Sequence, residues 1–214
     1  MITPSFARPK IILKQFDDVI RECWSVSIPP DEYSVCENEE WYCNTRKNGS
    51  NRSGTYAKGF RPGAIRTGCL GELAFAKLLK LPVDFGYKNK GDGGVDFRLY
   101  GVGLDVKVSY CDTYERDHCN RVQVINDRGK RVISKADFYV SGYVEYDDPD
   151  NRQAEVIFTG WISRNQLEKA NVNQGLSISV DKKTLCYKIQ FSDLCDLSNM
   201  VEFFSDRMKR GVPR

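Results

Sequence analysis

Apolar and polar positions along the chain predict a mixed α/β protein. Residues 64–81 have the composition of a helix and end just before Pro82, which cannot continue one. Residues 91–109 predict a β-hairpin, because apolar and polar residues alternate along its second half. Two further long strands are expected at 137–146 and 155–161, where β-branched and aromatic residues dominate.

The remaining segments predict scaffold around these elements. Apolar residues within Lys10 to Trp24 predict an N-terminal amphipathic helix, and Pro29-Pro30 is expected to stop any helix. A short strand is expected at 121–125, a short helix after Ser163, a strand at 185–191 and a final helix at 197–209. We expect residues 1–60 to form a helical and loop extension, and residues 61–214 to form the core domain.

The predicted hairpin carries an unusual set of charges. Asp105 and Lys107 point the same way because strand side chains alternate, and Asp96 lies on the preceding strand. The separating residues Leu104, Val106 and Val108 face the core. Charges on such a hairpin are costly to bury unless they bind a metal ion or pair with one another. Two carboxylates and an ammonium group around a divalent cation are suited to phosphodiester hydrolysis.

A third carboxylate lies upstream, on the predicted helix of residues 64–81. Glu72 shares a helix face with Phe75, Ala76 and Leu79, whereas the lysines lie toward the other side. A boundary glutamate whose head reaches solvent would explain this position equally well. Its place just before the acidic hairpin favours a functional role.

Together these residues resemble the active site of the PD-(D/E)XK nuclease superfamily. The pair "PD" is represented by Val95-Asp96, without the proline, and the second half by Asp105-Val106-Lys107, after the glutamate of the first helix. The resemblance implies a restriction-endonuclease-like core, in which helices flank a mixed central β-sheet. A structural ion cluster at a sheet edge is the alternative.

The resemblance also implies a mechanism and a cofactor. Asp96, Asp105 and the Val106 carbonyl would hold Mg²⁺, for which Mn²⁺ can substitute, and Glu72 would bind a second ion or a metal-bound water. Lys107 would orient the attacking water and offset the charge that builds on the phosphate.

A basic, aromatic segment precedes the predicted helix. Between Trp41 and Gly71 there are six basic residues and no acidic ones, with aromatic residues between them and a glycine- and serine-rich middle. Basic side chains contact phosphates, and aromatic rings stack on bases, so we expect a DNA-binding arm rather than an ordinary solvated loop. The residues expected to contact DNA are Arg46, Lys47, Arg52, Lys58, Arg61, Arg66, Tyr56 and Phe60.

Composition places limits on the cellular context. The 214 residues are 41% hydrophobic with a net charge of +3, and no apolar run is long enough to suggest a membrane span or a secretion signal. We therefore expect an intracellular, cytoplasmic protein. The eight cysteines lack CxxC spacing, which favours free thiols over zinc. The alternative is a zinc site formed by Cys36, Cys43, Cys111, His118 and Cys119.

The sequence thus predicts a Mg²⁺-dependent nuclease that acts on DNA, in particular an endonuclease of the restriction, homing or junction-resolving kind. A homodimer would allow two cuts on a duplex. The alternatives are an exonuclease of recombination or repair, and a non-catalytic nucleic-acid-binding protein that retains the fold.

Overall fold

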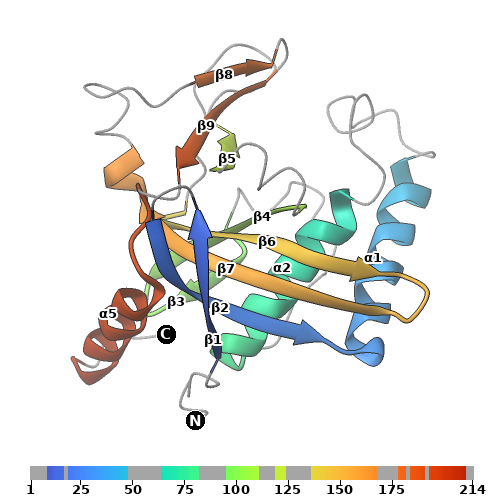
Figure 1. The fold of residues 1–214 in the computed structure, drawn as a ribbon, viewed down its shortest axis with the longest axis horizontal. Coiled ribbons are helices and arrows are strands. Elements are labelled where there is room, and N and C mark those ends of the chain that lie inside the picture. Colours follow the sequence, from blue (N-terminus) through green and yellow to red (C-terminus); the bar gives the residue numbers. More distant parts are fainter. Residues whose placement is uncertain are drawn as a thin grey trace.

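The computed structural model describes residues 9–16, 19–47, 64–81, 95–110, 119–123, 136–167, 178–181, 184–190 and 193–210. Six strands form the central sheet, namely β1 (Lys10–Phe16), β2 (Val19–Ile28), β3 (Phe97–Leu99), β4 (Val102–Tyr110), β6 (Phe138–Asp148) and β7 (Gln153–Ser163). A second sheet of three strands contains β5 (Cys119–Gln123), β8 (Ile178–Asp181) and β9 (Thr184–Gln190). The helices are α1 (Pro30–Lys47), α2 (Ala64–Leu79) and α5 (Leu197–Lys209) (Figure 1).

The central sheet is mixed, so the protein is α/β as expected. Its strand order is β1–β2–β7–β6–β4–β3, and every neighbouring pair is antiparallel except β4 with β6. Among the described helices, none is both long and apolar enough to cross a membrane.

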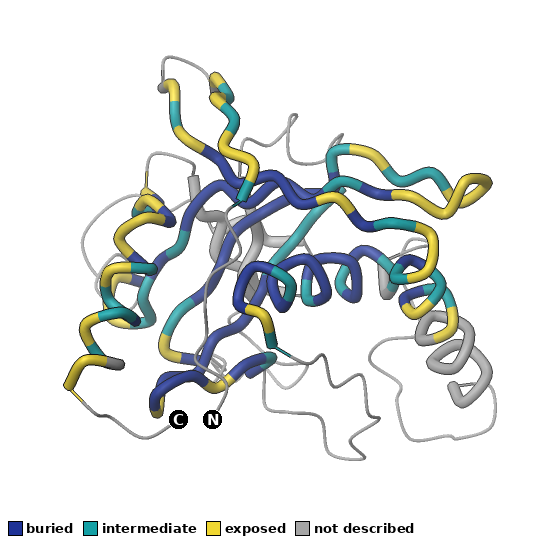
Figure 2. The backbone as a smooth tube through the Cα atoms, turned by 90° about the horizontal axis from the view of Figure 1, so that it is seen from below, coloured by how far each residue is buried: buried dark blue, intermediate teal, exposed yellow. Residues whose placement is uncertain are grey.

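The main hydrophobic core lies between the central sheet and its helices. Phe75 of α2 packs with its ring centroid 5.6 Å from that of Phe97 and 5.5 Å from that of Phe158, which joins the helix to β3 and β7. Leu197 and Phe204 of α5 are buried in the same cluster. Most of α2 is buried, as Figure 2 shows, because the helix is apolar on nearly all sides.

The structure confirms the central elements expected from the sequence. Helix α2 begins at Ala64, and β3 and β4 form the predicted antiparallel hairpin. The two turn residues, Tyr100 and Gly101, both have positive φ values of 49° and 75°, which matches the right-handed twist of a tight hairpin. Strands β6 and β7 and helix α5 also lie where they were predicted.

The predicted helix over Lys10 to Trp24 is wrong, because the structure forms β1 and β2 there. The two strands pair antiparallel, and β2 also pairs with β7, which lies far away in the sequence. Along residues 11–15, exposed and half-buried side chains alternate with the period of two that is typical of a strand. The hairpin is therefore part of the central sheet.

A helix also forms where the prolines were expected to stop one. Pro30 is the first residue of α1, a position that proline favours because its missing N–H has no helical partner there. Asp31 and Glu32 follow in the first turn, where negative charge stabilises the helix dipole.

Candidate active site

The start of β4 brings the two aspartates of the predicted site together. The backbone N–H of Asp96 donates to the Leu104 carbonyl oxygen at 2.8 Å, and its Oδ2 accepts from the Val106 N–H at 2.6 Å. Asp96 thus contacts the residues on both sides of Asp105. Asp105 is fully buried and forms an ion pair with Lys107, whose side chain is 35% exposed.

Asp137 fixes the start of β4. Its Oδ2 accepts from the Gly103 N–H at 2.7 Å, and its own N–H donates to the Gly103 carbonyl oxygen at 2.7 Å. Because β6 begins directly after Asp137 and runs parallel to β4, this contact sets the register that places Lys107 beside Ser141. The aspartate hairpin therefore rests on an ordered sheet.

The site lies where the edge of the sheet opens. Strand β3 pairs with β4 only from Val102 to Leu104. Beyond that point, at Asp105–Tyr110, no other described strand pairs with β4 on the side away from β6. Within the charged pair, Asp105 is fully buried, and Lys107 is the member that solvent reaches.

A close contact between α2 and β4 positions Glu72. A Cβ atom at residue 71 would lie 2.5 Å from Val108 Cγ2, so only glycine permits this approach. The next residue, Glu72, is half-buried, and its charge acts on Asp96 and Lys107 and on the buried thiol of Cys36 in α1. The structure thus brings the four predicted residues into electrostatic range of one another.

The ionisation of the site reflects burial and crowded negative charge. Burial, followed by the neighbouring charges of Glu72 and Asp105, raises the pKa of Asp96 to about 8 against the opposing effect of Lys107. Burial alone would lower the pKa of Lys107, but Asp105, Asp96 and Glu72 together raise it. At neutral pH, Asp96 therefore holds a proton while Lys107 is charged.

The donor chemistry of these residues suits a hard cation such as Mg²⁺, which prefers carboxylate and carbonyl oxygens. Burial, and after it the charges of Glu72 and Asp105, raise the pKa of Asp96, and a bound cation would favour the ionised form of this carboxyl group. Among the described residues, however, no three side chains of Asp, Glu, His or Cys stand close enough together to hold a metal ion. An ion shared by Glu72, Asp96 and Asp105 would require their side chains to turn toward one another.

The predicted DNA-binding residues fall mostly beyond the described part of the chain. Arg46 and Lys47 belong to the last turn of α1, whose side chains there are not described. Arg52, Tyr56, Lys58, Phe60 and Arg61 lie outside the described residues, as do Cys111 and His118 of the alternative zinc site.

Arg66 has a structural contact that the sequence did not reveal. Its Nη2 lies 2.9 Å from Asp147 Oδ2, and its guanidinium group lies 6.0 Å from the centre of the Tyr33 ring. The Tyr33 hydroxyl donates to the same carboxylate, so this cluster joins α1 and α2 to the end of β6. The three residues come from distant parts of the chain, and no local pattern connects them.

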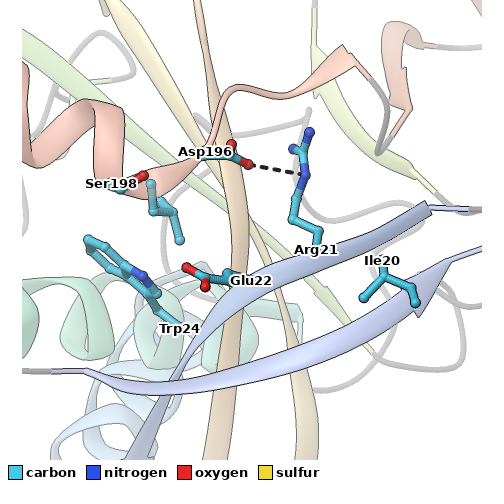
Figure 3. Close-up of a pocket in the computed structure, with 7 residues that line it drawn as sticks. Ile20, Arg21, Glu22, Trp24, Asp196 and Ser198 are labelled. Carbon is cyan, nitrogen blue, oxygen red and sulfur yellow. Dashed lines mark ion pairs between the residues drawn. The ribbon is translucent and has the colours of Figure 1, made fainter.

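A separate pocket of about 270 Å³ lies between β2 and the start of α5 (Figure 3). It is lined by Ile20, Arg21, Glu22, Trp24, Asp196, Leu197 and Ser198. An ion pair between Arg21 and Asp196, 3.4 Å apart, closes one side. None of its lining residues belongs to the predicted nuclease site.

Comparisons with protein-family models, curated proteins and solved structures gave no match for this chain.

Proposed function

We propose that the protein is a metal-dependent nuclease that hydrolyses DNA phosphodiester bonds, in particular an endonuclease, on a restriction-endonuclease-like core. The observation that carries this proposal is the charge of the site. Three carboxylates lie near one lysine, and burial, followed by the charges of Glu72 and Asp105, raises the pKa of Asp96 to about 8. A divalent cation would offset the excess of carboxylates and favour the ionised form of Asp96.

Each residue then has a distinct task. Asp96, Asp105 and the Val106 carbonyl would hold Mg²⁺ or Mn²⁺, with Glu72 beside them, after Asp96 has given up its proton. The bound ion would polarise the phosphate and lower the pKa of a water. Lys107, held by the buried carboxylate of Asp105, would orient that water and stabilise the negative charge of the transition state.

The exposure of Lys107 supports the same proposal. A double helix is too wide to enter an enclosed cavity, and its backbone could meet the Lys107 side chain, which is 35% exposed, at the surface. The basic segment before α2 would provide the phosphate contacts, through those of its residues that lie outside the described part.

A cleavage assay with matched variants tests the proposal. Supercoiled plasmid, linear duplex and single-stranded DNA are incubated with the purified protein and Mg²⁺, Mn²⁺ or EDTA. We expect cleavage with either metal, none with EDTA and none by Asp105→Asn, which keeps the shape of the side chain. Asp150→Asn removes an exposed carboxylate at the β6–β7 turn and should cleave like the wild type.

Equal cleavage by Asp105→Asn and the wild type would refute the site. DNA binding without cleavage by any preparation would favour the second candidate, a non-catalytic nucleic-acid-binding protein. The specific observation in its favour is that no three metal-ligating side chains converge among the described residues.

A further inference from the structure

The pocket between β2 and the start of α5 contains polar groups that the predicted nuclease site does not use (Figure 3). Ile20, Glu22 and Trp24 line it from one face of β2, because side chains two positions apart on a strand point the same way. The first turn of α5 lines it from another side. Its volume of about 270 Å³ is near the lower end of the range for small-molecule sites, so it suits a ligand of one or two rings.

Trp24 presents an unused hydrogen-bond donor to this pocket. The residue is only 7% exposed, yet no group among the described residues accepts a hydrogen bond from its indole N–H. Figure 3 shows the nitrogen of its ring on the side of the Glu22 carboxylate. A largely buried donor without a partner is costly, so this N–H favours a ligand that carries an acceptor.

Glu22 supplies the net charge of the pocket. It is exposed, and it forms no ion pair with any residue that the structure describes. The other two charged residues of the lining offset each other, because Arg21 Nε lies 3.4 Å from Asp196 Oδ1. The Arg21 Nη1 donates to the Leu194 carbonyl oxygen at 2.7 Å, which holds the guanidinium group in place. One carboxylate is thus in excess, which disfavours an anion and favours a ligand that donates hydrogen bonds to Glu22.

We propose that this pocket binds a guanine base, either in a free nucleoside or as an unpaired base of a nucleic acid. Guanine has two adjacent donors, N1–H and N2–H, which one carboxylate can accept together, and its neighbouring O6 accepts from the Trp24 N–H. In the other common bases, each donor group stands beside an acceptor that the Glu22 carboxylate would repel. The side chains of Ile20 and Leu197 supply apolar contact for the ring. This proposal does not depend on the proposed nuclease activity.

Titration calorimetry with three nucleosides tests the chemistry of the pocket. Guanosine is the probe, and inosine differs from it only by the absence of the 2-amino group. We expect inosine to bind more weakly than guanosine by about tenfold or more, because Glu22 then accepts one hydrogen bond fewer. Adenosine, which lacks both O6 and N1–H, should not bind detectably. Equal binding of guanosine and adenosine would overturn the proposal.

Two variants and a matched control locate the site. Glu22→Gln keeps the size of an exposed side chain but replaces one acceptor by a donor, so guanosine should bind about tenfold or more weakly. Trp24→Phe removes the N–H and should also weaken binding. The control, Glu202→Gln, changes an exposed residue of α5 outside the pocket and should bind like the wild type. Unchanged affinity in Glu22→Gln would overturn the proposal, even if Trp24→Phe fails to fold.

Two oligonucleotides distinguish the sources of the base. A thymine strand with a single central guanine is compared with the all-thymine strand by fluorescence anisotropy, for the wild type and Glu22→Gln. Tighter binding of the guanine strand that is lost in Glu22→Gln would show that the pocket accepts an unpaired base of a nucleic acid. Guanosine binding without this preference would assign the pocket to free nucleosides. If the protein neither binds guanosine at millimolar concentration nor prefers the guanine strand, the proposal is wrong.

Discussion

The protonation of Asp96 makes a quantitative prediction for the metal-free protein. In the unfolded chain an aspartate has a pKa near 3.8, whereas in the folded protein Asp96 has a pKa of about 8. Between these values the folded state binds more protons than the unfolded state, so the free energy of unfolding must fall as the pH rises. The substitution Asp96→Asn removes this proton while keeping an oxygen that can accept from the Val106 N–H.

The size of this pH effect on the free energy of unfolding follows from the shift in the pKa of Asp96. At about 1.4 kcal/mol per pKa unit, moving the pKa from 3.8 to about 8 corresponds to roughly 6 kcal/mol at most. Because Asp96 is only partly buried, solvent screens part of this cost. We therefore expect the free energy of unfolding of Asp96→Asn, relative to that of the wild type, to rise by about 2 kcal/mol between about pH 5 and about pH 8.

Urea unfolding in EDTA at several pH values measures this difference directly. Asp150→Asn removes an exposed carboxylate and should follow the wild-type pH dependence. If the difference between Asp96→Asn and the wild type stayed constant or shrank as the pH rose, Asp96 would not hold the proton. The charge argument for the metal site would then fail with it.

The other predictions concern the same site, the helix contacts and the basic segment. At neutral pH, Mg²⁺ binding should release about one proton in the wild type and none in Asp96→Asn, measured by calorimetry in buffers of different ionisation enthalpy. Lys107→Ala should abolish turnover but still bind Mg²⁺ or Mn²⁺, because ammonium is not a ligand; a folded variant that fails to bind either metal would contradict its role. Tyr33→Phe should cost about 1–3 kcal/mol in urea unfolding, because Asp147 is deprived of a buried donor, whereas Tyr146→Phe at an exposed position should be neutral. Neutralising four basic residues should lower the slope of log affinity against log salt by roughly 0.7–0.9 for each phosphate that the protein no longer neutralises, and an unchanged slope would make the segment an ordinary loop. Those four residues are Arg46, Lys47, Arg52 and Lys58.

The elements that the sequence predicted correctly are those whose partners are close along the chain. The β3–β4 hairpin closes through a two-residue turn, and α2 carries its own pattern of apolar spacing. For the same reason the sequence could place Asp105 and Lys107 on one face, since strand alternation alone requires it. Their ion pair in the structure follows from this local rule.

The segment from Lys10 to Trp24 shows where a local sequence pattern fails to predict secondary structure. Its apolar residues fit one face of a helix, but β2 has a partner in β7 that only the folded chain brings near. Once that pairing forms, Ile12 packs with a small buried cluster of neighbouring strands on one face of the sheet, whereas Ile11 and Leu13 lie on the other face and stay exposed. Tertiary pairing overrides a helical pattern because the ladder and its burial contribute more than local propensity.

The sequence by itself determined the chemical types at the candidate site, and the tertiary structure decided how they interact. The charge of Glu72 acts on Asp96 because Gly71 lets α2 approach Val108, and the raised pKa of Asp96 exists only once burial has removed water from the cluster. Likewise, Arg66 looks like one more cation in the sequence, whereas in the structure it pairs with Asp147. The sequence specifies the type of each residue, but desolvation and the distance between charges depend on the whole fold. These two quantities set the electrostatics of the site.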